Sequence, residues 1–345
     1  MDFQSIVRKH LINRTYVSYL LYPLSFIYTV FVVFKRQIYR FLPFLSYKSK
    51  IKIITVGNIT AGGTGKTPVT IYIAKCLQNR GLKVAIVLRG YRGKFENRNI
   101  LISDFNSVFN YANSAGDEAY LYTQKLPDTP VCVGKKRIKS IKILEKKFPE
   151  LDYIIMDDAY QNFKIKPDIS VCVLNSLNLF GNGFCLPAGI LREPFSSINY
   201  ADILILNGLN MPAISKKLYN KKYYIGNYEI SKCLNKEKIM EISTLQSSKN
   251  ILMSGIGLPQ SFEQTVNKAG IPYINHIILN DHFNYNEDFI KLLTKKVKEE
   301  DIDFIIITEK DYSKLANSDL PFVVIKVDFK INSKNENNFL SELLA

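Results

Sequence analysis

The segment Thr60-Ala-Gly-Gly-Thr-Gly-Lys-Thr67 constrains the fold of this chain more than any other, because of what stands on either side of it. An apolar β-type run, Ile51–Gly57, precedes it, and a helical pattern opens at Pro68, which suits a first helical turn. Glycines let backbone N–H groups curl around an anion. A lysine followed by a hydroxyl residue suits phosphate oxygens and Mg²⁺. Strand, loop and helix together predict a P-loop that binds a nucleoside triphosphate.

The loop departs from the strict P-loop pattern at one position, since Thr60 stands where glycine is usual. A glycine-rich turn without a ligand is the alternative, but the intact Gly65-Lys66-Thr67 favours phosphate binding. We therefore expect the whole loop to bind the nucleotide, with Lys66 on the β/γ oxygens and the Thr67 hydroxyl facing Mg²⁺. The expected nucleotide-binding residues are Thr60, Ala61, Gly62, Gly63, Thr64, Gly65, Lys66 and Thr67.

Strand patterns alternate with helical patterns along the rest of the chain, which predicts an α/β fold with a doubly wound, mostly parallel sheet. Near residue 207 the sequence changes to a Lys/Tyr-rich stretch, and a second set of strands and helices follows. We expect an N-terminal apolar segment at 1–48, a P-loop kinase domain at 49–207 and a smaller α/β domain at 208–345.

The N-terminal segment contains twenty uncharged residues between Arg14 and Lys35. That length permits a membrane-spanning helix. Pro23 and several tyrosines dilute the run, and basic residues flank both of its ends, so no orientation is indicated. A helix that lies in the headgroup region of a membrane fits these features better. The alternative is a core helix of a soluble domain.

The net charge of +15 and the pI of about 9.4 indicate an acidic partner, such as a phosphorylated substrate or an anionic membrane. Compositional drift toward lysine explains the charge equally well, because the lysines form no long basic tract. Nucleic-acid binding ranks last, since no recognition motif accompanies the charge. The five cysteines show no paired metal-ligand spacing, and three histidines are too few for a His-rich metal site.

Several acidic and basic pairs are candidates for chemistry. Asp157-Asp158 ends an apolar strand, which suits a carboxylate beside a P-loop that holds Mg²⁺. Asp117-Glu118 could supply a base for an attacking hydroxyl, although an acidic helix N-terminus explains the pair as well. Arg192-Glu193, in a loop between prolines, suits an anionic substrate. Asp281-His282 precedes a helical pattern, where a lone histidine is usually structural or solvated.

Seven motifs occur in the order in which they stand in the tetraacyldisaccharide 4′-kinase family of bacterial lipid A biosynthesis, and the chain resembles that family from about residue 50 to 311. The motifs are Val56–Pro68, Arg89-Gly-Tyr-Arg-Gly93, Gly116-Asp-Glu118, Asp157-Asp158 with Gln161, Pro187–Pro194, Asp281-His282-Phe283 and Thr308-Glu-Lys-Asp311. The apolar N-terminal segment also fits this family, which is membrane-associated. After Asp158 the family usually has Gly-Phe-Gln-His, whereas this chain has Ala159-Tyr-Gln-Asn162.

The resemblance implies transfer of the γ-phosphoryl group of ATP to the 4′-hydroxyl of an acylated glucosamine disaccharide 1-phosphate. It implies the following roles. The catalytic residues are Lys66, Asp117 as general base, and His282, which orients that base or tunes its pKa. Thr67, Asp157 and Asp158 serve Mg²⁺, Gln161 lies near the nucleotide, and Glu118, Arg192 and Glu193 contact the glycolipid.

The implied location is the cytoplasmic side of the bacterial inner membrane, with peripheral or monotopic attachment. The implied partners are the glycolipid and that membrane face, with no nucleic acid and no obligate protein partner. A membrane-tethered P-loop ATPase that acts as a nucleotide switch is the alternative. Such a switch would leave Arg192-Glu193 and Asp281-His282 without an obvious task.

Overall fold

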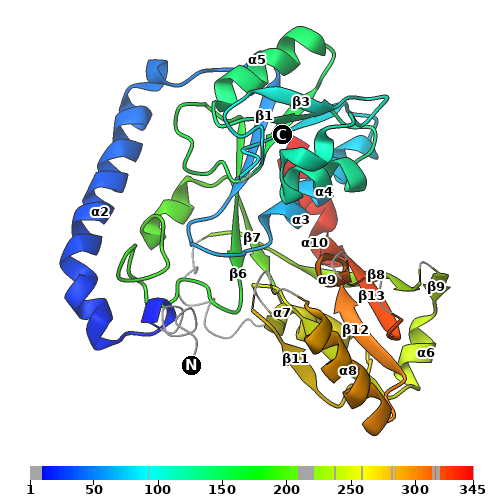
Figure 1. Ribbon diagram of the computed structural model, residues 1–345. Coiled ribbons are helices and arrows are strands. Elements are labelled where there is room, and N and C mark those ends of the chain that lie inside the picture. The colour runs from blue at the N-terminus through cyan, green and yellow to red at the C-terminus, as the bar shows by residue number, and fades with distance from the viewer. Residues whose placement is uncertain are drawn as a thin grey trace. The chain divides into compact units, whose positions relative to one another are not determined.

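The computed structural model describes residues 10–91, 93–208, 221–236, 238–257, 259–280, 283, 285–312, 315 and 319–344 (Figure 1). Its contacts divide the chain into two compact units, residues 1–226 with 331–345, and residues 227–330. The last residues therefore contact the first unit, whereas the sequence analysis grouped them with a C-terminal domain. The functional division into 1–48, 49–207 and 208–345 stays a prediction.

The first unit is built on a sheet whose strands lie in the order β8-β7-β6-β1-β5-β2-β4-β3. Every neighbouring pair is parallel except β3 with β4. The strands are β1 (Lys52–Gly57), β2 (Val84–Leu88), β3 (Ile100–Ser103), β4 (Val131–Val133), β5 (Tyr153–Met156), β6 (Ile169–Asn175), β7 (Ile203–Asn207) and the start of β8 (Tyr224–Asn235).

The position of β1 decides where a ligand can bind. β1 lies between β5 and β6, so that Thr55 is opposite Met156 on one side and Ser170 on the other. The carboxyl ends of parallel strands meet at one edge of a sheet, and ligands of such folds bind outside that edge where the strand order reverses. The segments that follow β1 and β5 therefore meet. The near-continuous apolar sequences of these strands match their burial on both faces.

Helices cover the sheet of the first unit. They are α2 (Tyr16–Phe41), α3 (Lys66–Gln78), α4 (Asp117–Lys125), α5 (Arg137–Lys147) and α10 (Ser333–Leu344), with short 3-10 turns η1 (Pro43–Leu45), η2 (Ala112–Ala115) and η3 (Phe195–Tyr200). Ile141 and Leu144 of α5 pack in one buried cluster with Ile53 and Ile154 of the sheet. The C-terminal helix α10 contacts α3, because Tyr72 donates a hydrogen bond to Glu336 over 2.8 Å.

Helix α2, the long blue helix of Figure 1, is the one helix among the described residues that is long and apolar enough to cross a membrane. Its start is fixed by Thr15, whose hydroxyl accepts from the Ser18 N–H while the Ser18 hydroxyl accepts from the Thr15 N–H. Its buried residues are the small polar Ser18 and Ser25. Large apolar side chains are exposed along it instead, among them Leu20, Phe26, Ile27, Phe31 and Phe34.

The second unit is a smaller α/β layer with strand order β11-β10-β12-β13-β8, and β9 pairs with β8. The pairs β10/β11, β10/β12 and β12/β13 are parallel, and β8/β9 is antiparallel. Its elements are β9 (Lys238–Met240), α6 (Ile242–Gln246), β10 (Asn250–Ser254), α7 (Pro259–Lys268), β11 (His276–Ile278), α8 (Glu287–Glu299), β12 (Phe304–Thr308), α9 (Glu309–Tyr312) and β13 (Phe322–Ile331).

The predicted fold class is confirmed, since a mostly parallel sheet carries the P-loop and a second α/β unit follows. The edge strand β3 and turn η2 were not predicted from the sequence. Strand β8 and helix α10 were not predicted either. These elements are rich in asparagine, and their strand or helix tendency is weak without the neighbours against which they pack.

Candidate functional site

The predicted P-loop joins β1 to α3 as expected. Gly65 forms the N-cap of α3 with φ of 86°, a left-handed conformation that favours glycine. The backbone N–H groups of Gly62, Gly63, Thr64 and Gly65 donate no hydrogen bond to any described residue. The start of α3 adds the positive end of a helix dipole. The loop therefore presents unused donors where an oligophosphate would bind.

Side chains from three other segments hold this loop in place. The Asn58 amide donates to the Thr64 hydroxyl over 2.9 Å, and Gln161 donates to the Asn58 carbonyl over 2.6 Å. Asn207, at the end of β7, donates to the Thr64 carbonyl over 3.0 Å. The N–H of Ala61 donates to the Ile190 carbonyl over 2.7 Å. Thr60 is buried and forms an antiparallel bridge with Leu191, so the first two loop residues support the loop's shape.

Asp157 follows β5 and is buried beside the start of α3. Its Oδ2 accepts hydrogen bonds from the Tyr122 hydroxyl over 2.7 Å and from the Thr67 hydroxyl over 3.0 Å. Burial raises the pKa of Asp157, although Tyr122 and the charge of Lys66 oppose that shift. Two predicted metal-site residues, Thr67 and Asp157, are therefore in direct contact.

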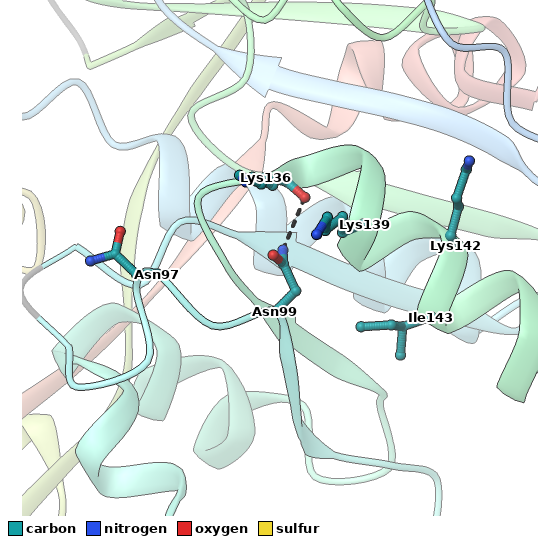
Figure 2. Close-up of a pocket in the computed structure, with 6 residues that line it drawn as sticks. All are labelled: Asn97, Asn99, Lys136, Lys139, Lys142 and Ile143. Atoms are coloured by element: carbon teal, nitrogen blue, oxygen red, sulfur yellow. Dashed lines mark hydrogen bonds between the residues drawn. The ribbon is translucent and has the colours of Figure 1, made fainter.

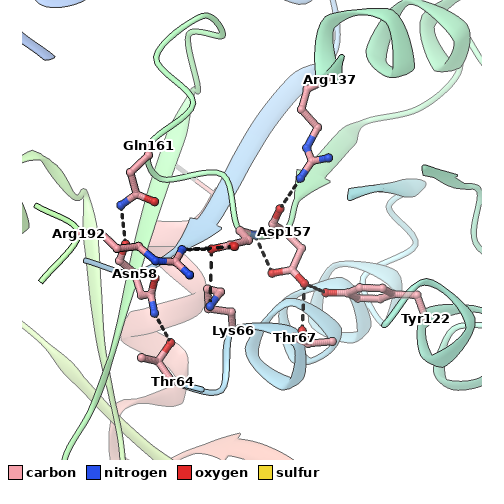
Figure 3. A network of polar contacts seen from close by, with 10 residues as sticks. Asn58, Thr64, Lys66, Thr67, Tyr122, Arg137, Asp157, Gln161 and Arg192 are labelled. Atoms are coloured by element: carbon pink, nitrogen blue, oxygen red, sulfur yellow. Dashed lines mark hydrogen bonds and ion pairs between the residues drawn. The ribbon is translucent and has the colours of Figure 1, made fainter. Parts of the chain in front are cut away.

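Asp158 contacts two cations, Lys66 and Arg192, which are both labelled in Figure 3. Its Oδ1 lies 3.6 Å from Lys66 Nζ and 3.0 Å from Arg192 Nη1. Burial alone would raise the pKa of Asp158, but the charges of Lys66 and Arg192 outweigh it and hold the pKa below its ordinary value. Lys66, Asp158 and Arg192 thus form a line of alternating charge beside the loop.

Asp117 and Glu118 form the exposed first turn of α4. Tyr122, one turn further along α4, ties this helix to Asp157. Although Glu118 is exposed, desolvation by the surrounding site and then the charge of Asp157 raise its pKa. The turn preceding α4 packs on the Arg89–Gly93 motif, where a Cβ on Gly93 would lie 2.1 Å from the Ala115 carbonyl oxygen. Glycine is therefore required for this contact.

The oxygen atoms near the start of α3 are suitable ligands for a divalent cation such as Mg²⁺. The Thr67 hydroxyl and two carboxylates offer the oxygen ligands that this ion prefers, and it usually keeps several waters. No group of three histidine, cysteine or acidic side chains with metal-ligand geometry occurs in the described ranges. A cation held by Thr67, Asp157 and Asp158 would therefore take its remaining ligands from phosphate oxygens and water.

Two predicted site residues, Glu193 and His282, are not among those that the described part of the chain brings together beside the P-loop. Glu193 is completely buried, and its Oε2 lies 2.6 Å from Nη2 of Arg36 in α2, so it does not face a substrate as the sequence analysis expected. Its burial follows from the α2 contact, which no local pattern indicates. His282, with Asp281, lies outside the described residues. Asn162 lies in a turn that follows β5, where its N–H donates to the Ala159 carbonyl.

Three residues that contact the P-loop or Asp157 were not predicted as site residues from the sequence: Asn58, Tyr122 and Arg137. Arg137 begins α5, is buried, and donates to the Gly134 carbonyl over 2.8 Å and to the Asp157 carbonyl over 3.4 Å. Burial lowers the pKa of Arg137 to about 10, although Asp157 and Asp158 oppose that shift. The basic run Lys135-Lys-Arg137, one residue after the β-type run Val131–Val133, was the available signal for Arg137. Nothing in the sequence marks Tyr122.

Two further polar features share no residue with this site. A hollow of about 420 Å³ beside α5 is lined by Asn97, Asn99, Lys136, Lys139, Lys142 and Ile143 (Figure 2). In the second unit, the buried Asp311 of the Thr308–Asp311 motif accepts hydrogen bonds from the Tyr285 hydroxyl over 2.8 Å and from the Gly255 N–H over 3.1 Å. That motif therefore supports the fold of the second unit.

Comparison with known proteins agrees with this geometry. The family described as Tetraacyldisaccharide-1-P 4'-kinase matches residues 17–345. The chain belongs to this family. Proteins named tetraacyldisaccharide 4'-kinase are similar to it along most of their length. The one from Francisella tularensis subsp. novicida is 32% identical, covering 87% of this chain and 91% of the relative, and the one from Halothermothrix orenii is 29% identical, covering 88% and 84%.

A solved relative shows the same fold. The crystal structure of LpxK from Aquifex aeolicus in complex with ATP superposes with a TM-score of 0.71 at 25% identity, covering 95% of this chain and 98% of that one. The family and the α/β fold predicted from the sequence motifs are confirmed, and so is the assignment of the chain to kinases. The roles of individual site residues stay predictions.

Proposed function

We propose that this chain transfers the γ-phosphoryl group of ATP to the 4′-hydroxyl of a tetraacyldisaccharide 1-phosphate, a step of lipid A synthesis. Membership of the family supports the reaction. The observation that carries the proposal is the meeting of Lys66, Asp158 and Arg192 beside a loop with unused N–H donors. Phosphoryl transfer depends mainly on positioning and charge neutralisation, and this arrangement offers both.

ATP is the phosphoryl donor in this proposal, as the similarity to an ATP complex suggests. The N–H groups from Gly62 to Gly65 would bind the phosphate oxygens, and Lys66 would neutralise the terminal groups. Mg²⁺, when bound, would neutralise charge between the β- and γ-phosphates. Thr67, Asp157 and Asp158 are the residues that would hold it.

Asp117 is the proposed base for the 4′-hydroxyl. It lies in the exposed first turn of α4, where its carboxylate is open to an incoming sugar, and Tyr122 fixes α4 to the metal-site carboxylate Asp157. The proton of the hydroxyl would pass to Asp117 as the oxygen attacks phosphorus. The role of His282 in orienting this base is proposed from the family resemblance alone.

The proposed location is the cytoplasmic face of the bacterial inner membrane. The exposed apolar side chains of α2 support attachment to lipid, because a soluble monomer rarely exposes a continuous apolar face of this kind. The glycolipid acceptor lies in the same membrane, so attachment would bring its sugar headgroup close to the P-loop unit.

The test is a transfer assay with purified protein, Mg·ATP and the acylated disaccharide 1-phosphate in detergent micelles. A new phosphomonoester on the acceptor is expected. Lys66→Ala should reduce its formation by at least about 100-fold, whereas Lys48→Ala, at an exposed position, should leave it unchanged. ATP consumption that is independent of the acceptor would instead indicate the nucleotide switch and contradict the proposal.

A further inference from the structure

A buried ion pair joins the membrane-type helix α2 to the loop that carries Arg192. Nε and Nη2 of Arg36 lie 2.8 Å and 2.6 Å from Oε2 of Glu193. The Glu193 side chain is 0% exposed, and that of Arg36 is 12% exposed. Such a pair contributes little net stability, because desolvation offsets its attraction, but removing one partner leaves a costly unpaired charge. The pair therefore fixes geometry more than it stabilises the fold.

Aromatic rings hold the Arg36 guanidinium on its other sides. The rings of Tyr160, Phe163 and Tyr200 have their centroids 4.9, 4.6 and 4.7 Å from it. Tyr160 lies two residues after Asp158, and its hydroxyl donates to the Ser197 carbonyl over 2.6 Å. Arg36 thus contacts the segment after β5 and turn η3 as well as Glu193. Cation–π contacts of a desolvated arginine restrict its position further.

The residue next to Glu193 is held at its main chain from both sides. The Tyr28 hydroxyl of α2 donates to the Arg192 carbonyl over 2.9 Å, and the Arg192 N–H donates to the Ile59 carbonyl over 2.7 Å, directly before the P-loop. The Arg192 guanidinium then donates to the Asp158 carboxylate over 3.0 Å. A continuous set of contacts therefore runs from α2 through Glu193 and Arg192 to Asp158.

We propose that Arg36 is a positioning residue for phosphoryl transfer, which acts by holding Arg192 against Asp158 through Glu193. The inference rests on the proposed function, because Arg192 matters only if the P-loop site transfers phosphate. It gives α2 a second task besides attachment to lipid: the helix also shapes the charged line beside the P-loop. Glu193 serves this task from inside the protein and does not contact the substrate.

The test compares four variants with the wild type by measuring kcat, KM for ATP, thermal unfolding and binding to lipid vesicles. Each kcat is calculated from the concentration of folded protein. Arg36→Met leaves Glu193 unpaired, and it should lower both Tm and kcat. We expect kcat to fall by about 10- to 100-fold with KM for ATP changed less than about threefold, because small misplacement of charged groups acts on the reacting geometry. The control Arg40→Met removes an exposed cation from the same helix, and it should change neither Tm nor kcat.

The double variant Arg36→Met/Glu193→Met separates positioning from stability. Replacing both charges by apolar side chains of similar volume often restores stability. We expect Tm to return to that of the wild type while kcat stays at least about 10-fold low, because the charged link from α2 through Glu193 is lost and, among the described contacts with α2, Arg192 keeps only the Tyr28 hydrogen bond. Recovery of kcat together with Tm would overturn the proposal and leave the pair a purely structural contact.

Tyr28→Phe is a second, milder variant that tests the same inference if Arg36→Met does not fold. It removes one hydroxyl from the Arg192 carbonyl, and we expect kcat to fall by about 3- to 10-fold with vesicle binding unchanged. An unchanged kcat would count against the inference. The wild type and Arg40→Met must both form the phosphomonoester. If neither forms it, the proposed function fails, and this result is distinct from a failure of the inference about Arg36.

Discussion

At the scale of residues, Asp157 and Asp158 show how two adjacent carboxylates contact different partners. Asp158 has φ of 48°, a left-handed conformation that is uncommon outside glycine and tends to occur at functional sites. It turns the second carboxylate toward Lys66 and Arg192, while the first stays with Thr67 and Tyr122. Neighbours in sequence thus have pKa values shifted in opposite directions.

Tyr122→Phe tests the support of Asp157. The change removes one hydroxyl from a fully buried ring and leaves its volume almost unaltered. We expect kcat to fall by about 10-fold, because a hydrogen bond to an ionised group is worth about 1.5 to 3 kcal/mol. Steady-state kinetics of the transfer reaction would measure this. Tyr120→Phe, on the exposed side of the same helix, is the matched control.

Asp117→Ala tests the proposed base. Removal of a general base should lower kcat by at least about 100-fold. The Kd for ATP should stay within about threefold, since among the described residues Asp117 makes no hydrogen bond or ion pair with the loop that would bind phosphate. Calorimetric titration with ATP and the transfer assay together measure both quantities. Near-normal turnover would remove Asp117 from this role.

At the scale of elements, α5 braces the connection between α2 and β1. Glu145 of α5 accepts hydrogen bonds from the Tyr47 hydroxyl over 2.7 Å, the Ser49 hydroxyl over 2.7 Å and the Lys50 N–H over 2.9 Å. Burial alone would raise the pKa of Glu145, but these donors hold it below its ordinary value. One carboxylate therefore fixes the chain that leads from the apolar helix into the P-loop strand.

Glu145→Gln should destabilise the protein by about 2 kcal/mol at pH 7, because the amide is a weaker acceptor for three donors. A lowered folded-state pKa contributes stability that is complete above the unfolded pKa and is lost as pH falls through the folded value. The difference in Tm between wild type and variant should therefore shrink below about pH 4. Thermal unfolding from pH 3 to about 8 measures it. Glu150→Gln, an exposed change nearby, should show no such trend.

At the scale of the whole molecule, two faces of α2 have different tasks. One face meets the protein through hydroxyls and arginine, as in the Ser25 contact with the Cys185 carbonyl over 2.5 Å. The other exposes large apolar side chains, which a membrane interface would cover. The helix is thus polar where it joins the protein and apolar outside, which reverses the usual pattern of a surface helix.

Leu20→Ser/Ile27→Ser/Phe31→Ser/Phe34→Ser tests the outer face. These side chains are 79, 65, 64 and 63% exposed, so the fold should not need them. We expect binding to phosphatidylethanolamine–phosphatidylglycerol vesicles to fall by at least about 10-fold, because each apolar side chain buried in lipid contributes about 1.5 to 3 kcal/mol. Vesicle co-sedimentation measures this. Ile239→Ser/Leu292→Ser, at exposed apolar positions of the second unit, should bind as the wild type does.

The sequence by itself determined the strand–loop–helix around Lys66, the family and the α/β class. Short contiguous segments encode these features: glycine spacing sets the loop, and apolar runs set the buried parallel strands. β3, β8 and α10 escaped prediction, because their patterns are weak and packing supplies what local propensity lacks.

Only the tertiary structure decided which charges meet. The structure places Asp158 in contact with Lys66 and Arg192. It places Tyr122 and Arg137 in contact with Asp157, and it buries Glu193 against Arg36. These partners are up to 157 residues apart in the chain, as for Arg36 and Glu193. The interaction of two distant charges depends on their separation in space and on their burial, and neither quantity is written in a local pattern.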